Sequence, residues 1–300
     1  MERKLKLGWT IFFLFFFGLV FLFPLWPDKK LHLIFCNVGQ GDGILVKQGR
    51  VQVVIDGGPG EMAMVDCLGK HLPPWDKEIE LLVLTHPDND HLGGLVAVLK
   101  RYEVGQIVVN SVIKEADPFW QFYQSVVEEK TQIYSPQAGD QFILGPLELT
   151  IIWPVQKLGN PQIWQPQYLA SLENNGGERA VLGATEVGED SNETSIVFKL
   201  SYGHFDTLLT GDIGFDTENV LEFPDIEVLK VPHHGSRFST SEELLEETTP
   251  DWAVISVGKN TFGHPTQEVL DRLSQKGIKV ARTDQGEVEI ISDGQSYWFK

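Results

Sequence analysis

Four side chains of the types that bind metal ions lie within six consecutive residues of this chain. They are His86, Asp88, Asp90 and His91, in the segment THPDNDHLGG at residues 85–94. In a locally extended chain His86 and Asp88 point the same way, whereas Asp90 and His91 are adjacent and can turn toward a second point. Imidazole and carboxylate groups together suit ions such as Zn or Mn. The spacing therefore indicates two ions, although a polar turn whose histidines cap the neighbouring elements is the alternative.

Three further clusters of polar side chains follow predicted strands. LLTGDIG carries Asp212, whose carboxylate could bridge two cations or belong to an ordinary turn. LKVPHHGS carries His233 and His234, and two adjacent histidines before a glycine favour a metal site. GKNTFGHP carries Asn260 and His264, where a histidine before proline also fits a helix start. A turn explains any one cluster, but four clusters at strand ends together predict a shared site.

The periodicity of apolar residues predicts the elements that position these clusters. A strand at 79–84 ends just before the first cluster, and residues 92–102 place apolar side chains at helical spacing after it. The other predicted strands are 31–36, 43–47, 51–55, 106–110, 131–134, 147–153, 194–201, 204–209, 227–231, 252–257, 279–281, 287–291 and 297–299. The other predicted helices are 61–72, 118–129, 215–223, 241–247 and 265–275. This order predicts an α/β (α+β) protein with two facing sheets and helices outside them.

A β-hairpin is expected around Tyr202 and Gly203 as its two-residue loop. In that register Asp212 lies opposite Glu193, which brings residues 192–195 alongside the predicted site. His204 then lies far along the strand, and we expect it to be structural.

Local signals mark the ends of two helices and one irregular segment. Thr240 with Glu243 predicts a capping box, and Pro265 fits the first position of a helix. Residues 154–191 lose periodicity and fill with Gly, Asn, Pro, Gln and Glu. They are expected to form a long surface excursion, either a binding loop or a segment without a specific role.

The N-terminal region is expected to be a transmembrane signal anchor, residues 1–30. Residues 9–26 are 18 uncharged residues, and a helix of that length is about 27 Å long, close to the thickness of the hydrocarbon core. A cleaved signal peptide is the rival interpretation, but PDKK follows where small residues would be needed. Arg3, Lys4 and Lys6 favour an N-terminus inside. We therefore expect a single-pass protein of the cell membrane with an extracytoplasmic domain, residues 31–300.

Acidic residues dominate that domain. It has 19 Lys and Arg residues against 40 Asp and Glu residues, a formal net charge of −21. Such a surface repels polyanions, and the sequence lacks the basic stripe of a sequence-independent nucleic-acid binder. A phosphate-bearing substrate would need a local source of positive charge, which bound divalent cations can supply.

The chain contains two cysteines, Cys36 in a predicted strand and Cys67 in a predicted helix. We expect both to be small buried apolar side chains and not a disulfide framework. On that interpretation they say little about the compartment.

Taken in order, the motifs resemble the metallo-β-lactamase superfamily, and within it the extracellular hydrolase domain of the ComEC competence proteins. HPDNDHLGG is similar to the His-x-Asp-x-Asp-His signature of that group, with Asp88 where most of the superfamily has histidine. The other matching blocks are CNVGQGDGILV at 36–46, VIDGG at 54–58, LLTGD at 208–212, LKVPHHGS at 229–236 and NTFGHP at 260–265. The resemblance covers about residues 31–300 and lacks the multi-helix membrane channel of full-length ComEC.

The resemblance implies an αββα sandwich with two divalent ions, Zn or Mn, at its edge. The implied metal ligands are His86 and Asp88 for one ion, Asp90 and His91 for the other, Asp212 as the bridge, and His233 or His234 to complete the second. The superfamily's further histidine before the bridging aspartate has no counterpart here. Asn192, Glu193 or Ser195 are the polar residues that the expected hairpin offers instead.

Other residues are expected to assist the metal ligands. Asp56 either caps a tight turn or, as the resemblance implies, orients a metal-bound histidine, and Asp42 is expected near the site because Gly39 and Gly41 indicate a close backbone approach. The expected catalytic residues are Asp90, His264 and His234. The proton for the leaving oxygen is expected to come from His264 or from whichever of His233 and His234 does not bind metal. The expected substrate-binding residues are Ser236, Asn260 and Asn192.

These expectations indicate hydrolysis by metal-activated water. The leading hypothesis is a membrane-anchored, metal-dependent phosphodiesterase or nuclease acting on DNA outside the membrane, with a competence-type membrane channel as a partner. The net charge of −21 counts against long nucleic acid, so a small-ester hydrolase, for a phosphocholine-type phosphodiester or a lactone, is the alternative. The missing histidine motivates a third hypothesis, a non-catalytic DNA-uptake accessory protein.

Overall fold

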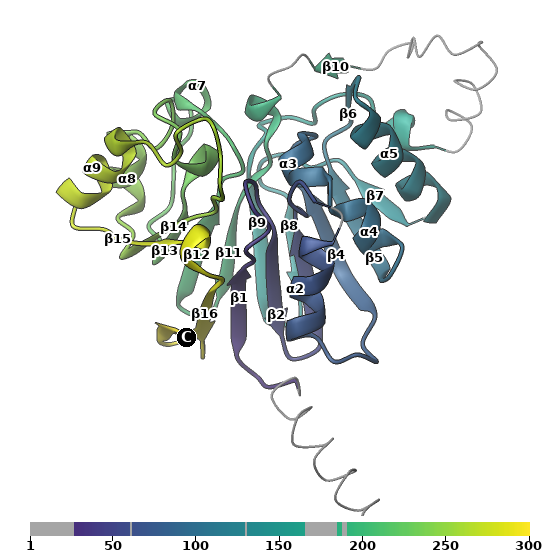
Figure 1. Cartoon of the computed structure of the whole chain (residues 1–300), viewed down its shortest axis with the longest axis horizontal. Helices are drawn as coiled ribbons and strands as arrows, with labels where there is room; N and C mark the ends of the chain where they lie inside the picture. The colour runs from purple at the N-terminus through teal and green to yellow at the C-terminus, as the bar shows by residue number, and fades with distance from the viewer. Residues whose placement is uncertain (1–26, 61, 130, 166–184, 188–190) are drawn as a thin grey trace, which may run out of the picture.

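Two large β-sheets frame the part of the chain that the computed structural model describes, residues 27–60, 62–129, 131–165, 185–187 and 191–300 (Figure 1). The strands of the first sheet are β1 (Leu31–Phe35), β2 (Ile44–Gln48), β3 (Val51–Ile55), β4 (Glu78–Leu84), β5 (Glu103–Val109), β7 (Gln132–Tyr134), β16 (Val288–Ser292) and β17 (Tyr297–Phe299). They lie in the order β17-β16-β1-β2-β3-β4-β5-β7. Strands β3, β4, β5 and β7 are parallel to one another, so their carboxyl ends meet at one edge.

The second sheet has seven strands in the order β15-β14-β13-β12-β11-β9-β8. They are β8 (Gln141–Leu144), β9 (Leu147–Trp153), β11 (Val197–Tyr202), β12 (Phe205–Leu209), β13 (Val228–Lys230), β14 (Trp252–Ile255) and β15 (Lys279–Arg282). Strands β12 to β15 are parallel, which again gathers carboxyl ends at one edge. A separate parallel pair joins β6 (Val112–Lys114) to β10 (Thr185–Val187).

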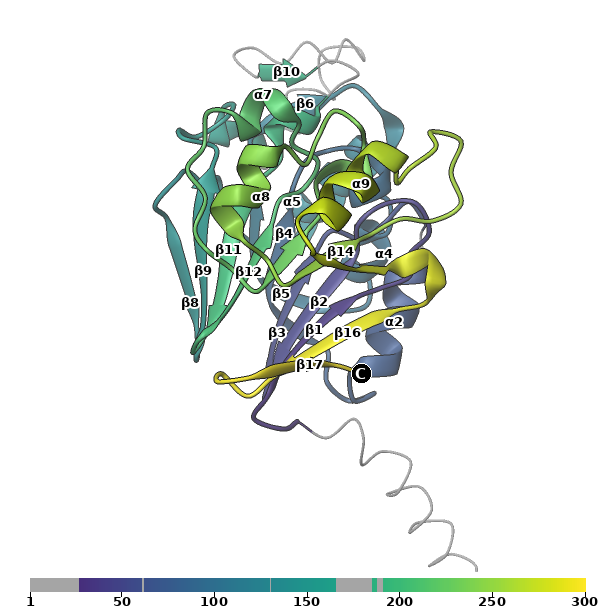
Figure 2. The ribbon, with the colours of Figure 1, turned by 90° about the vertical axis from the view of Figure 1, so that its left-hand side faces the viewer.

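Helices cover the outer faces of both sheets. The helices that accompany the first sheet are α2 (Ala63–His71), α3 (Asn89–Leu92), α4 (Leu95–Leu99) and α5 (Asp117–Glu129), and those that accompany the second are α7 (Phe215–Glu218), α8 (Glu242–Thr248) and α9 (Gln267–Gln275). Short 3-10 turns are η2 (Pro161–Trp164), η3 (Asn192–Thr194), η4 (Pro232–Gly235) and η5 (Thr283–Gln285). In Figure 1, α8 and α9 lie on one side of the sheets and α4 and α5 on the other; Figure 2 views the molecule from the side of α8 and α9.

Strand alternation divides the apolar residues into three layers. On β1, Leu33 and Phe35 face the core between the sheets, whereas Ile34 faces the core beneath α2, α4 and α5. Leu229 on β13 belongs to a third core beneath α8 and α9. Because a strand buried on both faces is apolar throughout, β1 and β4 read as nearly continuous apolar runs. The predicted sandwich of two facing sheets with helices outside is therefore confirmed for the described residues.

The hairpin register differs from the prediction. Ser201 pairs with Asp206 and Tyr202 with Phe205, so the loop is Gly203 and His204. Gly203 has φ +63°, and a two-residue loop that opens with positive φ favours glycine at its first position. The shift brings Ser195, and not Glu193, opposite Asp212, whose backbone N–H donates to Ser195 Oγ at 2.9 Å.

Helix starts also differ from the prediction. Ser241, and not Thr240, caps α8, because its Oγ accepts from the Leu244 N–H at 3.1 Å. Pro265 precedes α9, whose N-cap is Thr266. The single helix expected over residues 92–102 is interrupted at Gly93 and Gly94, where an added Cβ would lie 2.6 Å and 2.1 Å from backbone oxygens of residues 59 and 57.

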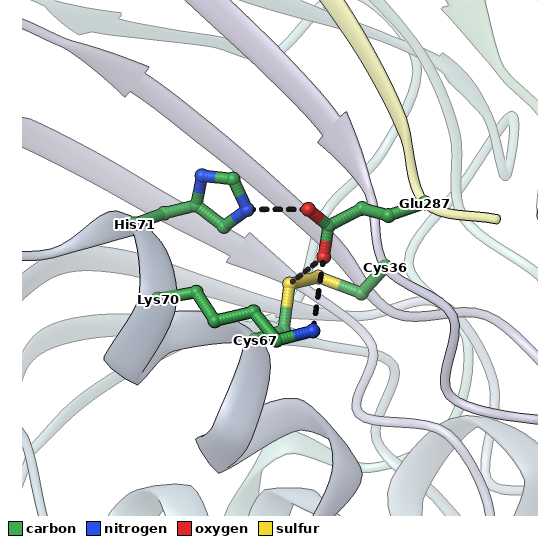
Figure 3. The surroundings of a disulfide bond; sticks show 5 residues. All are labelled: Cys36, Cys67, Lys70, His71 and Glu287. Atoms are coloured by element: carbon green, nitrogen blue, oxygen red, sulfur yellow. Dashed lines mark hydrogen bonds and ion pairs between the residues drawn. A yellow bond between two sulfur atoms is a disulfide. The ribbon is translucent and has the colours of Figure 1, made fainter. Parts of the chain in front are cut away.

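The expectation that both cysteines are only buried apolar side chains is wrong. Cys36 and Cys67 form a disulfide with a Cα–Cα separation of 6.0 Å (Figure 3). The bond joins the end of β1 to α2, beside Glu287. Because the pairing depends on how α2 packs on the sheet, sequence spacing alone did not reveal it.

The predicted anchor at residues 9–26 lies outside the described residues. Among the helices that the structure does describe, none has both the length and the hydropathy required to cross a bilayer.

Candidate metal centre

Loops at the carboxyl ends of three strands converge on one point of the sandwich edge. The loop after β4 brings Asp90 and His91, the loop after β12 brings Asp212, and the loop after β13 brings His234. One ligand atom from each of these four residues lies within 4.8 Å of all the others. In Figure 1 this edge is the end near α3 and α7, away from the C-terminus. We call Asp90, His91, Asp212 and His234 the four-residue centre.

His91 is held in one orientation by Asp56. Its Nδ1 lies 2.8 Å from Asp56 Oδ2, and Thr85 donates to both Asp56 oxygens, from its N–H at 2.8 Å and its hydroxyl at 2.7 Å. An ionised Asp56 makes His91 Nδ1 the protonated nitrogen, which directs Nε2 toward Asp212 Oδ2, 3.3 Å away. This carboxylate–histidine arrangement is the one that orients metal ligands in proteins.

His234 is held by the backbone of β14's carboxyl end. Its Nδ1–H donates to the Ser256 carbonyl at 2.8 Å, which leaves Nε2 3.0 Å from Asp212 Oδ2 and 3.5 Å from Asp90 Oδ2. His233 and His234 have φ +48° and +54°, an unfavourable conformation for residues with a Cβ. It turns the two rings apart, so that His234 is buried in the centre while His233 contacts the ring of His264.

The Nε2 atoms of His86, His91 and His234 are buried, and none makes a well-directed hydrogen bond among the described residues. Those of His91 and His234 face Asp212 Oδ2 as ion pairs at 3.3 and 3.0 Å. A buried polar atom without a partner, as His86 Nε2 is, costs about 1–3 kcal/mol. A cation bound between these nitrogens and the adjacent carboxylates would satisfy them. The donor set, nitrogen and carboxylate oxygen without thiolate, fits a borderline divalent ion such as Zn or Mn.

The electrostatics of the four-residue centre also favour a cation. Burial lowers the pKa of His234, but the Asp212 and Asp90 carboxylates outweigh burial and raise it to about 9. Burial likewise opposes the charge of His91, and Asp212 and Asp56 raise its pKa well above its ordinary value. For Asp212, burial raises the pKa, but His234, His91 and Lys230 together hold it well below its usual range. Without metal, protons on the imidazoles balance the carboxylates.

Lys230 is a site residue that the sequence reasoning missed. It is 1% exposed, and its Nζ lies 2.5 Å from Asp42 Oδ2, 2.7 Å from the Gly211 carbonyl and 3.2 Å from Asp212 Oδ1. Burial lowers the pKa of Lys230, but Asp42 and Asp212 outweigh it and raise the pKa. A signal was present, since a lysine inside the apolar strand just before the HHGS block requires a buried acidic partner.

The GQGD loop lies directly behind Asp90. Asp42 N–H donates to the Asp90 carbonyl at 3.1 Å. Gly41 has φ +134°, and a Cβ at this position would lie 2.0 Å from the same carbonyl oxygen. Glycine is therefore required at 41 for the loop to approach closely enough to bring the Asp42 carboxylate to Lys230.

The structure does not bring all the expected ligands together. Asp88 Oδ1 accepts from Lys114 Nζ at 2.6 Å and from the Ser191 hydroxyl, and Asp88 is not part of the four-residue centre. His86 Nδ1 faces the hydroxyls of Thr85 and Ser195 at 3.1 and 3.3 Å. His233 lies outside the centre.

The residues considered as substitutes for the missing histidine have other contacts. Glu193 Oε1 accepts from the Gly214 N–H at 3.1 Å, and its Oε2 accepts from the Thr217 hydroxyl. Ser195 Oγ accepts from the Asp212 N–H. Asn192 lies half-buried in η3. Of the three, Ser195 touches both His86 and Asp212, as a neutral hydroxyl between them.

The residues expected to contact substrate differ in how the structure uses them. Asn260 organises its own loop, because its Nδ2 donates to the Gly258 and His264 carbonyls and its Oδ1 accepts from the Gly263 and His264 N–H groups. Ser236, expected to contact substrate, is buried, with 4% of its surface exposed. His264 is partly exposed, and burial together with the nearby His233 and His234 lowers its pKa to about 4. It is therefore neutral at pH 7.

Comparison with known proteins gives one family match. A family model described as "Metallo-beta-lactamase superfamily" matches residues 36–259. The curated relatives include ComE operon protein 3 of Bacillus subtilis, 29% identical over 294 residues, covering 89% of this chain and 33% of that protein. Recombination protein 2 of Haemophilus influenzae is 27% identical and covers 87% of this chain and 28% of that protein. The chain thus spans about a third of the length of these relatives.

Solved structures share the fold at low identity. The metallo-beta-lactamase fold protein YhfI from Bacillus subtilis superposes with a TM-score of 0.54 at 11% identity, covering 91% of this chain and 100% of that one. Igni18, a metallo hydrolase from the archaeon Ignicoccus hospitalis, gives a TM-score of 0.51 at 16% identity, covering 88% and 99%. At such identities the agreement concerns the fold alone.

Proposed function

The chain belongs to the metallo-beta-lactamase superfamily, and from this premise we propose that it is a membrane-anchored, metal-dependent phosphodiesterase that acts on DNA outside the membrane. The observation that carries the hydrolase part is the four-residue centre, in which the buried Nε2 atoms of His91 and His234 converge on the carboxylates of Asp212 and Asp90. The names of two relatives, a recombination protein and a competence protein, favour DNA as the substrate class.

The residues that would hold a divalent ion are those of the four-residue centre. Such an ion supplies Lewis-acid activation of water and of a phosphoryl oxygen. Asp56 orients His91 for this role, and the Ser256 carbonyl orients His234. Both contacts use Nδ1, so Nε2 of each histidine is the nitrogen that would hold the ion after releasing its proton.

Two histidines lie at the rim. His264, with its pKa lowered to about 4, is neutral at pH 7 and suits the acceptance of a hydrogen bond, but it is too weak a base to hold a proton at that pH. His233 lies beside it, with ring centroids 5.7 Å apart, and is the histidine of the 233/234 pair outside the four-residue centre. We assign His233 the donation of a proton to the leaving oxygen.

An aromatic rim favours a substrate with bases over a small ester. Phe262 is 69% exposed and stacks on the His264 ring at a centroid distance of 5.8 Å. Phe238 is 68% exposed, with the guanidinium of Arg237 over its ring at 5.9 Å. Exposed aromatic side chains are what nucleobases stack on in single-stranded nucleic-acid sites. The net charge of −21 remains the argument for the small-ester alternative.

The disulfide supports an extracytoplasmic location. Disulfides persist in oxidising compartments and are rare in the cytosol, and Cys36–Cys67 accounts for both cysteines of the chain. An outward-facing domain held by residues 9–26 would place the centre where incoming DNA reaches a competence-type membrane channel.

One experiment separates the three hypotheses. The full chain, purified in detergent and loaded with Mn²⁺ or Zn²⁺, would be assayed on single-stranded DNA and on bis-p-nitrophenyl phosphate. DNA turnover supports the proposed function, whereas turnover of the small ester alone supports the small-ester hydrolase. No turnover of either substrate by metal-loaded protein supports the accessory protein.

A further inference from the structure

A buried lysine lies among the carboxylates of the metal centre. We propose that the centre holds one divalent ion and that the ammonium group of Lys230 supplies the positive charge that a second ion would otherwise supply. The inference rests on the proposed function, since it concerns the metal content of the same site.

The first step concerns the two oxygens of Asp212. Asp212 Oδ1 lies 3.2 Å from Lys230 Nζ, while Oδ2 faces His234 Nε2 at 3.0 Å and His91 Nε2 at 3.3 Å. Asp212 therefore turns one oxygen toward the histidines that would hold an ion and the other toward a lysine.

The second step counts the donors for a second ion. Asp88, the expected carboxylate, is bound to Lys114 and Ser191. Ser195 is occupied by the Asp212 N–H, and Glu193 by Gly214 and Thr217. Of the expected ligands for that ion in the described part of the chain, His86 keeps a buried Nε2 without a hydrogen bond. Catalytic zinc sites typically use three protein ligands, so one imidazole does not form a second site.

The third step concerns charge. Lys230 touches Asp42 as well as Asp212, and both carboxylates are at most 2% exposed. Buried carboxylates require compensation by cations. Lys230 and one divalent ion together supply three positive charges, which match the carboxylates of Asp42, Asp90 and Asp212. A neutral side chain at 230 would release an oxygen of Asp42 and of Asp212 to attract a further cation.

Metal stoichiometry tests the proposal without an activity assay. The full chain in detergent would be stripped of metal, titrated with Mn²⁺ alone, and followed by the electron paramagnetic resonance of free Mn²⁺, with elemental analysis of the saturated protein. We expect a plateau of one ion per chain for the wild type and for Lys230→Arg, and of two ions for Lys230→Met. Lys199→Met, which removes a lysine paired with Asp206 at 3.0 Å on the same sheet, is the matched control and should keep one ion.

The outcomes separate this inference from the proposed function. A wild-type plateau of two ions contradicts the single-ion centre, even if Lys230→Met fails to fold. A folded Lys230→Met variant that binds one ion also contradicts it. Two bound ions together with DNA turnover would contradict the single-ion centre and support the proposed phosphodiesterase, whereas one bound ion without DNA turnover would support the single-ion centre and contradict the phosphodiesterase.

Discussion

Asp56 and His91 form a buried pair, with Asp56 Oδ2 2.8 Å from His91 Nδ1 and neither side chain exposed to solvent. Asp56 has φ +56°, an unfavourable conformation that the surrounding contacts maintain. Its two oxygens also accept both hydrogen bonds of Thr85, the residue between β4 and the HPDNDH motif. One carboxylate thus fixes both the imidazole and the loop that carries it.

Replacing Asp56 by asparagine should weaken metal binding while retaining the fold. The amide carbonyl can accept one of the hydrogen bonds, but it lacks the charge that holds His91 in the correct tautomer. Loss of such a partner typically reduces metal affinity about 10- to 100-fold. Competition titration against a chromophoric chelator measures the affinity. Asp206→Asn, a carboxylate paired with Lys199 away from the centre, is the control. Unchanged affinity in Asp56→Asn would show that the pair is only structural.

Asp212→Ala should abolish turnover and leave the secondary structure intact. Asp212 Oδ2 faces the Nε2 atoms of both His91 and His234, at 3.3 and 3.0 Å, so its removal takes away the group that the two histidines share. The change should also lower Mn²⁺ affinity. Circular dichroism establishes whether the variant is folded, and hydrolysis of bis-p-nitrophenyl phosphate or DNA measures its activity. Undiminished activity in a folded variant would exclude Asp212 from the mechanism.

Reducing the disulfide should destabilise the domain by about 4 kcal/mol, the loop-closure estimate for a separation of 31 residues. Urea unfolding with and without dithiothreitol gives the difference. The double variant Cys36→Ser, Cys67→Ser should match the reduced protein and show no further response to the reductant. If the stability of the wild type did not change with dithiothreitol and its two thiols reacted freely, the disulfide would not form in the protein.

Sequence patterns predicted the sheets and most of the centre, because both depend on local regularities. Alternation identified the strands, and the rule that sites gather at strand carboxyl ends led to a larger set of expected ligands, which included Asp90, His91 and Asp212 and left His233 and His234 as alternatives. The predictions that were wrong concern residues whose partners are distant in the sequence. Asp88 is taken up by Lys114 and Ser191, which lie 26 and 103 residues away.

In the hairpin, a one-residue difference in the position of the loop changes which residues face each other near the metal centre. The loop was expected at 202–203, and the structure has it at Gly203 and His204. Both loops contain the same glycine, so sequence did not distinguish them. The difference decides whether Ser195 or Glu193 contacts Asp212, and hence which side chain lies next to the metal ligands.

The pH dependence of stability should include a contribution from Glu289. This carboxylate accepts from His32 at 2.8 Å and from Lys300 at 2.8 Å. Burial raises the pKa of Glu289, but these hydrogen bonds outweigh burial and lower it from 4.5 to about 2. A carboxyl whose folded pKa is depressed stabilises the protein fully above its unfolded pKa and loses that effect as the pH falls through the folded pKa. The contribution should therefore be present above pH 4.5 and disappear between pH 4.5 and 2.

Glu289→Gln isolates this contribution. At pH 7 the variant should unfold at a lower temperature than the wild type, with a free-energy difference of about 1 kcal/mol after allowance for solvent screening. The gap should narrow as the pH falls below 4.5 and close near pH 2, because protonated glutamic acid and glutamine then make similar contacts. Thermal unfolding followed by circular dichroism between pH 7 and 2 measures the gap, and Glu268→Gln, an exposed position on α9, is the control. A gap that stays constant over this range would mean that Glu289 acts through packing and not through its charge.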